Sequence, residues 1–227
     1  MSTPLSDDGL FDLPDSAREP NAKVLLVTGA SGCGKTRFTS RTGLPVVSLD
    51  DFYYDGDRPN MPQRHGIIDW DSPETWDRQG AVNKLVELCT VGEAVLPVYD
   101  IPSNSRVGER VVSMDGRRIL LAEGIFAAEI IDDLRAEGIL ADALCIRRPR
   151  LQTFWFRLMR DLDEARKPFF NLVRRGISHY LNEPKMYAEL ESKGARSVSY
   201  TEAHETLTQM LAALRWKSSA QPTPGKD

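Results

Sequence analysis

The feature that most constrains the fold is a glycine-rich run, GASGCGKT, at positions 29–36. It fits the pattern G-x-x-x-x-G-K-[ST] in full and directly follows the apolar run KVLLVT at positions 23–28, a predicted β-strand. Glycines allow backbone N–H groups to turn inward around a phosphate, and the N-terminus of a following helix adds its positive dipole end. Strand, loop and helix together predict a phosphate-binding P-loop.

The chemistry of such a loop predicts ATP and Mg²⁺ as cofactors. Its lysine, Lys35, reaches the β- and γ-phosphates, and the hydroxyl group of Thr36 binds Mg²⁺. The residues predicted to bind the nucleotide are Gly29, Ser31, Gly32, Cys33, Gly34, Lys35 and Thr36.

Four further apolar runs are predicted to be strands, at residues 45–49, 94–99, 118–122 and 141–146. Helical periodicity is found in residues 73–91, 149–162, 169–181 and 201–216. This alternation predicts an α/β P-loop NTPase fold, a doubly wound and mostly parallel sheet flanked by helices. We expect one P-loop domain over residues 21–216, with flexible tails at residues 1–20 and 217–227.

Ligands of doubly wound folds bind outside the carboxyl ends of the strands. Two carboxylates, Asp50 and Glu123, follow predicted strands and should face the phosphate site. One can hold the metal with Thr36, and the other can accept a proton from an attacking hydroxyl group. No guanine-specific NKxD motif and no LSGGQ signature is found in the sequence, which counts against switch GTPases and ABC-type transporters.

Basic charge is concentrated between residues 147 and 175, where nine Lys or Arg accompany three Asp or Glu, although the whole chain carries −4. Arg157 and Arg160 are three residues apart and share one face of a predicted helix. We interpret the segment as a helical lid that places arginines against the transferred phosphoryl group. A solvated surface helix and an RNA-binding patch are the alternatives.

The overall composition favours a cytoplasmic enzyme with a small-molecule partner. The net charge of −4 offers no general attraction to nucleic acid or anionic lipid, and no apolar run approaches the length of a membrane helix. The three cysteines show no metal-binding spacing and suggest a reducing compartment. We therefore expect no nucleic-acid or membrane partner, and a homo-oligomer remains open.

The order of motifs resembles that of the uridine/cytidine kinase family, from about Lys23 to Glu189. The matching segments are the P-loop, SLDDFY at 48–53, DWDSPETWD at 69–77, PVYD at 97–100, SNSR at 103–106, EGIF at 123–126 and FRLMRD at 156–161. The joint occurrence of these motifs in this order is more specific than any one of them.

The resemblance implies a role for each matching residue. Asp50 matches the catalytic base, with Lys35, Arg157 and Arg160 as phosphate-binding catalytic residues. Thr36, Asp50 and Glu123 match the metal site. The residues that match the nucleoside pocket are Tyr53, Trp70, Asp71, Tyr99, Asn104 and Arg106.

The implied activity is ATP-dependent phosphorylation of the 5′-hydroxyl of uridine or cytidine, a pyrimidine salvage reaction. Asn104 stands where these kinases usually carry a histidine, and the end of the lid differs from the family pattern. Two alternatives therefore stay open. One is a kinase for another ribosyl or small alcohol, such as nicotinamide riboside or a sugar phosphate. The other is a regulatory protein that binds or hydrolyses ATP without an acceptor.

Overall fold

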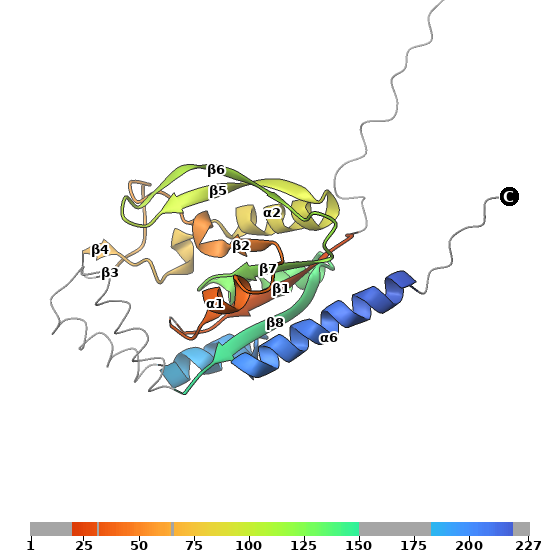
Figure 1. Ribbon diagram of the computed structural model, residues 1–227. Coiled ribbons are helices and arrows are strands. Elements are labelled where there is room, and N and C mark those ends of the chain that lie inside the picture. The colour runs from red at the N-terminus through yellow and green to blue at the C-terminus, as the bar shows by residue number, and fades with distance from the viewer. Residues whose placement is uncertain (1–19, 31, 65, 150–182, 220–227) are drawn as a thin grey trace, which may run out of the picture.

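A five-stranded, all-parallel sheet forms the centre of the computed structural model, which describes residues 20–30, 32–64, 66–149 and 183–219 (Figure 1). The strand order is β2-β7-β1-β8-β9. These strands are β1 (Lys23–Thr28), β2 (Val46–Ser48), β7 (Ile119–Glu123), β8 (Leu140–Arg147) and β9 (Arg196–Ser199). The predicted doubly wound α/β fold is confirmed.

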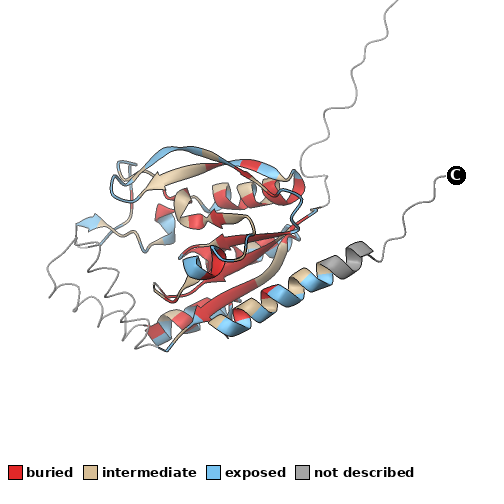
Figure 2. Cartoon of the chain, viewed as in Figure 1, coloured by how far each residue is buried: buried red, intermediate tan, exposed pale blue. Residues whose placement is uncertain are grey.

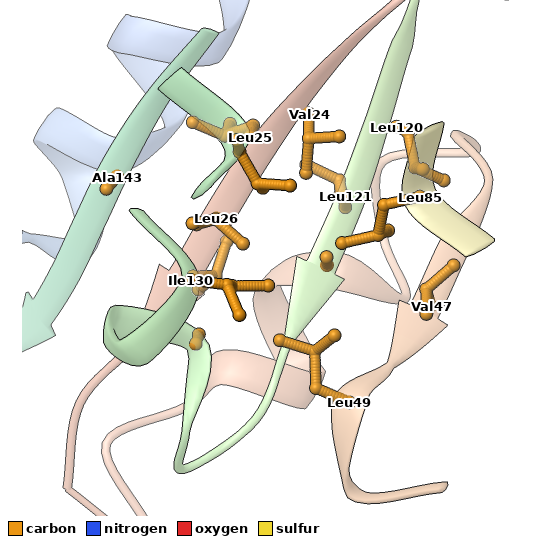
Figure 3. Close-up of a cluster of buried hydrophobic side chains, with 14 of the residues drawn as sticks. Val24, Leu25, Leu26, Val47, Leu49, Leu85, Leu120, Leu121, Ile130 and Ala143 are labelled. Carbon is orange, nitrogen blue, oxygen red and sulfur yellow. The ribbon is translucent and has the colours of Figure 1, made fainter. Parts of the chain in front are cut away.

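The core lies along the two central strands. Val24, Leu25 and Leu26 of β1 and Leu120 and Leu121 of β7 are at most 1% exposed, so both faces of the sheet are covered (Figures 2 and 3). This explains why the strands are near-continuous apolar runs instead of alternating ones.

Within the described residues, four helices flank the sheet, and residues 183–192 are helical as well. Asp77 begins the second of them, where its Oδ1 accepts a hydrogen bond of 2.9 Å from Gly80 N. The last helix runs along β8 and β9 (Figure 1). The helices are α1 (Lys35–Thr39), α2 (Arg78–Thr90), α3 (Ile131–Ala136) and α6 (Tyr200–Ser219), accompanied by the 3₁₀ turns η2 (Leu49–Phe52), η3 (Pro73–Thr75) and η4 (Ala127–Ile130).

The strand predicted at residues 94–99 forms, but it does not join the central sheet. It is β5 (Glu93–Asp100), and it pairs antiparallel with β6 (Ser105–Ser113) in a separate ribbon that packs over α2 and η2 (Figure 1). A further small hairpin joins β3 (Gln63–Arg64) to β4 (Ile67–Ile68). The prediction that this run belonged to a common parallel sheet was wrong, because only the face of β5 with Ala94 and Leu96 is buried, while Val95 on the other face is 42% exposed.

The carboxyl ends of the central strands lie at one edge of the sheet. Ser48 of β2 and Val27 of β1 both pair with Glu123 of β7, and Thr28 pairs with Cys145 of β8. Whatever follows these strands is therefore gathered in one place. The predicted lid with helices at 149–162 and 169–181 lies almost entirely in residues 150–182, outside the described residues.

Within the residues that the structure describes, no helix has both the length and the apolar character that crossing a bilayer requires.

Candidate active site

The loop after β1 has the backbone that phosphate binding needs. Gly29, Gly32 and Gly34 have φ angles of 135°, 82° and 102°, a region that favours glycine. A β-carbon on Gly29 would lie only 2.6 Å from the carbonyl oxygen of Ile146 at the end of β8. The first glycine of the motif is therefore required both by its backbone angles and by its close contact with the neighbouring strand. Ser31 lies outside the described residues.

Lys35 begins α1, and its side chain turns back over the loop. Its Nζ donates to the carbonyl oxygens of Gly29 at 2.9 Å and Ala30 at 3.4 Å. The ammonium group is thus held at the mouth of the loop, where phosphate oxygens are its natural acceptors.

Thr36 and Glu123 meet as the sequence predicts, since the Thr36 hydroxyl donates a 2.9 Å hydrogen bond to Glu123 Oε1. No group of three or more His, Cys, Asp or Glu side chains close enough to hold a metal is found among the described residues. Mg²⁺ in nucleotide sites takes only one or two carboxylates, and phosphates and water supply the remaining oxygens. A hydroxyl group beside a carboxylate at the phosphate loop fits that requirement.

Asp50 is a further half-buried carboxylate at this edge. It lies in η2, and its Oδ1 accepts a 3.3 Å hydrogen bond from Ile125 N, just after β7. Burial raises the pKa of Asp50 above its ordinary value, although the Ile125 hydrogen bond and the charge of Lys35 oppose the shift. Asp50 is therefore a stronger base when ionised than an exposed aspartate.

Three of the predicted pocket residues form an aromatic cluster next to η2. The ring centroid of Tyr53 lies 5.5 Å from that of Trp70 and 5.6 Å from that of Tyr99. The Tyr53 hydroxyl donates to the carbonyl oxygen of Trp70 at 3.1 Å, and burial raises its pKa. The hydroxyl of Tyr53 is thus used within the protein, and the rings are what the cluster offers to a ligand.

Arg106 makes its described contacts with the protein itself. Its guanidinium donates to the carbonyl oxygens of Tyr53 at 3.2 Å and Phe52 at 3.5 Å, and to Asp77 at 3.3 Å. These bonds tie β6 to the end of η2, so the geometry gives Arg106 a positioning role beside the ligand-binding role that the resemblance implies.

Asn104 lies in the turn between β5 and β6, with a positive φ of 50° that asparagine tolerates better than most residues. The backbone carbonyl oxygen of Asn104 accepts a 2.8 Å hydrogen bond from Gly56 N. A β-carbon on Gly56 would lie 3.1 Å from Asn104 Cβ and 3.6 Å from Trp70 Cζ2, so Asn104 approaches the aromatic cluster.

A cavity of about 390 Å³ opens beside the phosphate loop. Its described lining combines Thr28, Gly29 and Ala30 with Asp71, Ile125 and Phe126. Asp71, predicted to hold ribose hydroxyl groups, therefore lies on the same cavity as the P-loop. The predicted lid residues Arg157 and Arg160 lie outside the described residues.

Arg148, which the sequence motifs did not assign, also reaches the phosphate loop. Its guanidinium lies 2.9 Å from where a β-carbon of Gly34 would be, and 5.1 Å from the ring centroid of Tyr200 in α6. In the sequence, Arg148 is marked only by its place in the pair Arg147-Arg148 after a predicted strand. Its charge alone does not distinguish it from the other arginines of the basic segment.

Known proteins resemble the chain in sequence and in fold. No family model matches the chain. A uridine kinase from Ureaplasma parvum serovar 3 is 23% identical over 198 residues, covering 83% of this chain and 93% of that protein. Inorganic pyrophosphatase TTM2 from Arabidopsis thaliana is 34% identical over 118 residues, which are 48% of this chain but only 16% of that protein.

Among solved structures, a candidate fructose transport system kinase from Silicibacter sp. TM1040 matches with a TM-score of 0.53 at 20% identity. The match covers 81% of this chain and 91% of that one. The fold, the phosphate loop and the curated relatives define the chain as a P-loop kinase, a phosphotransferase. The resemblance to uridine kinases that the sequence motifs indicate is also confirmed, over most of the chain.

Proposed function

We propose that the protein transfers the γ-phosphoryl group of ATP to the 5′-hydroxyl of a pyrimidine nucleoside, converting uridine or cytidine to its monophosphate. In this proposal it is a cytoplasmic enzyme of pyrimidine salvage. The relatives named uridine kinase support the acceptor class, and the aromatic cluster offers flat rings for a base to stack on.

The observation that carries the proposal is the position of Asp50. Its Oδ1 accepts a hydrogen bond from Ile125 N, two residues after Glu123, and Asp50 lies in η2, which ends directly before Tyr53 of the aromatic cluster. A base between a phosphate loop and an aromatic pocket can accept the proton of a hydroxyl group that attacks the γ-phosphate.

The other residues have supporting roles in this scheme. Lys35 neutralises charge on the phosphates, while Thr36 and Glu123 would hold Mg²⁺. Mg²⁺ supplies charge neutralisation on the β- and γ-phosphates. Asp71 on the cavity wall would hold ribose hydroxyl groups, and Arg157 and Arg160 of the proposed lid would contact the transferred group.

Mass spectrometry of reactions with ATP, Mg²⁺ and a mixture of nucleosides and ribosyl compounds tests the proposal. We expect UMP or CMP with the wild type. Asp50→Asn should lose about two to four orders of magnitude in turnover while nucleotide binding is kept. Wild-type turnover in Asp50→Asn would refute Asp50 as the base.

A kinase for another ribosyl compound or small alcohol is the second candidate, because Asn104 beside Trp70 replaces the family's histidine. Phosphorylation of nicotinamide riboside or a sugar phosphate, with none of uridine or cytidine, would favour it. ATP hydrolysis that is independent of any added hydroxyl compound would instead favour a regulatory ATPase.

A further inference from the structure

The cavity beside the phosphate loop is also lined by charged residues that the sequence did not predict. Besides the predicted Asp71, its described lining includes three more carboxyl groups, Glu129, Glu183 and Glu189, and one cation, Lys193. Glu129 lies in η4, which follows β7 after three intervening residues, and the other three come from residues 183–193, which precede β9. Apart from Glu183, which is only 4% exposed, three described carboxylates, Asp71, Glu129 and Glu189, line this cavity against one described cation, an excess of two negative charges.

Lys193, the one cation among the described residues of this lining, forms ion pairs with two of these carboxylates. Lys193 Nζ lies 2.5 Å from Glu129 Oε1 and 2.8 Å from Glu189 Oε1. This hydrogen bonding raises the pKa of Lys193 against the effect of its burial, and it lowers the pKa of Glu189. Lysine and glutamate are thus both charged near neutral pH, and the ammonium is shared between two acceptors.

A negatively charged acceptor entering this cavity would lose hydration without finding an available cation on the described wall. Like charges within a few ångströms repel each other strongly in a partly dehydrated site. An uncharged acceptor escapes this penalty because its hydroxyl groups can donate hydrogen bonds to carboxylates, and a cationic acceptor gains attraction. The apolar side chains of Ile125 and Phe126 on the same cavity suit an uncharged ring equally well.

We propose that this carboxylate wall makes the kinase select uncharged or cationic hydroxyl compounds and reject phosphorylated or carboxylated ones. Glu129, Glu189 and Lys193 are then the residues that set charge specificity. The inference rests on the proposed phosphotransferase function, and it excludes sugar phosphates as acceptors while leaving uridine, cytidine and nicotinamide riboside as candidates.

Matched acceptor pairs test the selection directly. Nicotinamide riboside and nicotinic acid riboside share the same 5′-hydroxyl and differ by one carboxylate, and fructose and fructose 6-phosphate differ by one phosphate. For whichever pair shows turnover, and for uridine against 5-carboxyuridine, we expect kcat/KM of the member that carries the extra carboxylate or phosphate to be lower by about tenfold or more. Added salt should narrow the difference in kcat/KM. Equal or better use of the carboxylated or phosphorylated member would overturn the inference.

Two substitutions should move the selectivity in opposite directions, which loss of folding could not do. Glu129→Gln removes one carboxylate and releases Lys193, so the preference for the uncharged acceptor should fall by about threefold to tenfold. Lys193→Gln leaves both glutamates uncompensated, and the preference should rise. Glu87→Gln is the matched control, because Glu87 pairs with Lys84 on the surface of α2.

The outcomes also separate this inference from the proposed function. If no compound of either charge is phosphorylated by the wild type, the proposed function fails and the charge selection with it. If an acceptor is phosphorylated but Glu129→Gln and Lys193→Gln leave the selectivity at the level of Glu87→Gln, the kinase stands and the carboxylate wall does not set specificity.

Discussion

At the scale of single residues, Gly124 allows the close approach of Asp50, the proposed catalytic base, to the end of β7. A β-carbon at this position would lie 2.8 Å from Leu49 Cβ and 2.9 Å from Asp50 Oδ1. Both distances are shorter than a van der Waals contact, so η2 would have to move. The glycine of the EGIF motif is thus explained by the need to bring Asp50 close to the end of β7.

Gly124→Ala should therefore impair chemistry more than nucleotide binding. We expect kcat to fall by about tenfold or more, since small displacements of a positioned base are costly, while the KM for ATP stays within about twofold. Steady-state kinetics measure both. Gly108→Ala is the control, because a β-carbon on Gly108 would meet nothing within 4 Å. An unchanged kcat in Gly124→Ala would show that η2 adapts freely.

The raised pKa of Asp50 predicts a pH dependence of stability. Because burial favours the protonated form, the folded state binds this proton more tightly than the unfolded state. The stabilisation is fully present below the pKa of the unfolded chain and is lost as the pH rises through the folded-state pKa. Near neutral pH the ionised, half-buried carboxylate therefore costs stability.

Asp50→Asn removes that cost, because asparagine cannot ionise and its amide oxygen can still accept from Ile125 N. We expect this variant to have a higher Tm than the wild type near neutral pH, by a few degrees, and the difference to shrink on acidification. Thermal unfolding followed by circular dichroism across this pH range decides the matter. A lower Tm at neutral pH would show that the ionised form is instead stabilised in the fold.

At the scale of elements, the β5–β6 ribbon is fastened to η2 by charged contacts. Asp51 accepts hydrogen bonds of 3.3 Å from both Tyr99 N and Arg110, and Arg106 joins η2 to Asp77 at the start of α2. The ribbon thereby keeps Tyr99 against Tyr53 and Trp70. An element outside the central sheet thus builds one wall of the candidate pocket.

Arg106→Lys tests whether Arg106 positions this wall or binds the acceptor directly. A lysine cannot reproduce the three directed contacts of the guanidinium, so in either case the KM for the acceptor should rise by about tenfold and that for ATP should not. A positioning role also predicts faster amide hydrogen exchange in β6 and η2 without any ligand. Arg117→Lys, at an exposed position beyond β6, is the control. Unchanged exchange alongside a raised KM would favour direct binding.

At the scale of the whole molecule, those parts of the fold that the sequence alone could predict are the ones with a strong local signal. Strands β1, β2, β7 and β8 were predicted to within two residues at either end, because a strand buried on both faces reads as an apolar run. The P-loop was predictable because phosphate binding requires glycines at fixed spacing. The proximity of Asp50, Thr36 and Glu123 was also predictable, because the segments that carry them end or follow parallel strands whose carboxyl ends lie at one edge of the sheet.

The remaining parts depend on contacts that are distant in the sequence. Strand β6 was not predicted, since SRVGERVVS is largely exposed and mixes charged with apolar residues. The four residues of β9 are too short to stand out, and β5 was placed in the wrong sheet because its partner was missing. Glu129, Glu189 and Lys193 have no motif at all, and only the fold brings η4 beside residues 183–193.

This common edge of the sheet predicts how nucleotide binding should act on the whole molecule. At the proposed site, ATP with Mg²⁺ would bind only when β1, α1 and β7 are assembled, so it should stabilise the folded state. At a ligand concentration of 100 times Kd the gain is about 2.7 kcal/mol, which corresponds to several degrees in Tm for a chain of this size. Thermal shift measurements with and without the nucleotide would show it.

Three variants separate nucleotide binding from chemistry in the same assay. Lys35→Ala should lose most of the shift, because its ammonium is aimed into the phosphate loop, whereas Asp50→Asn should keep it. Lys84→Ala, which alters only a surface pair on α2, should behave as the wild type does. If Asp50→Asn lost the thermal shift as Lys35→Ala does, Asp50 would belong to the nucleotide site. Another residue at the carboxyl ends of the central strands would then have to be the base for the acceptor hydroxyl.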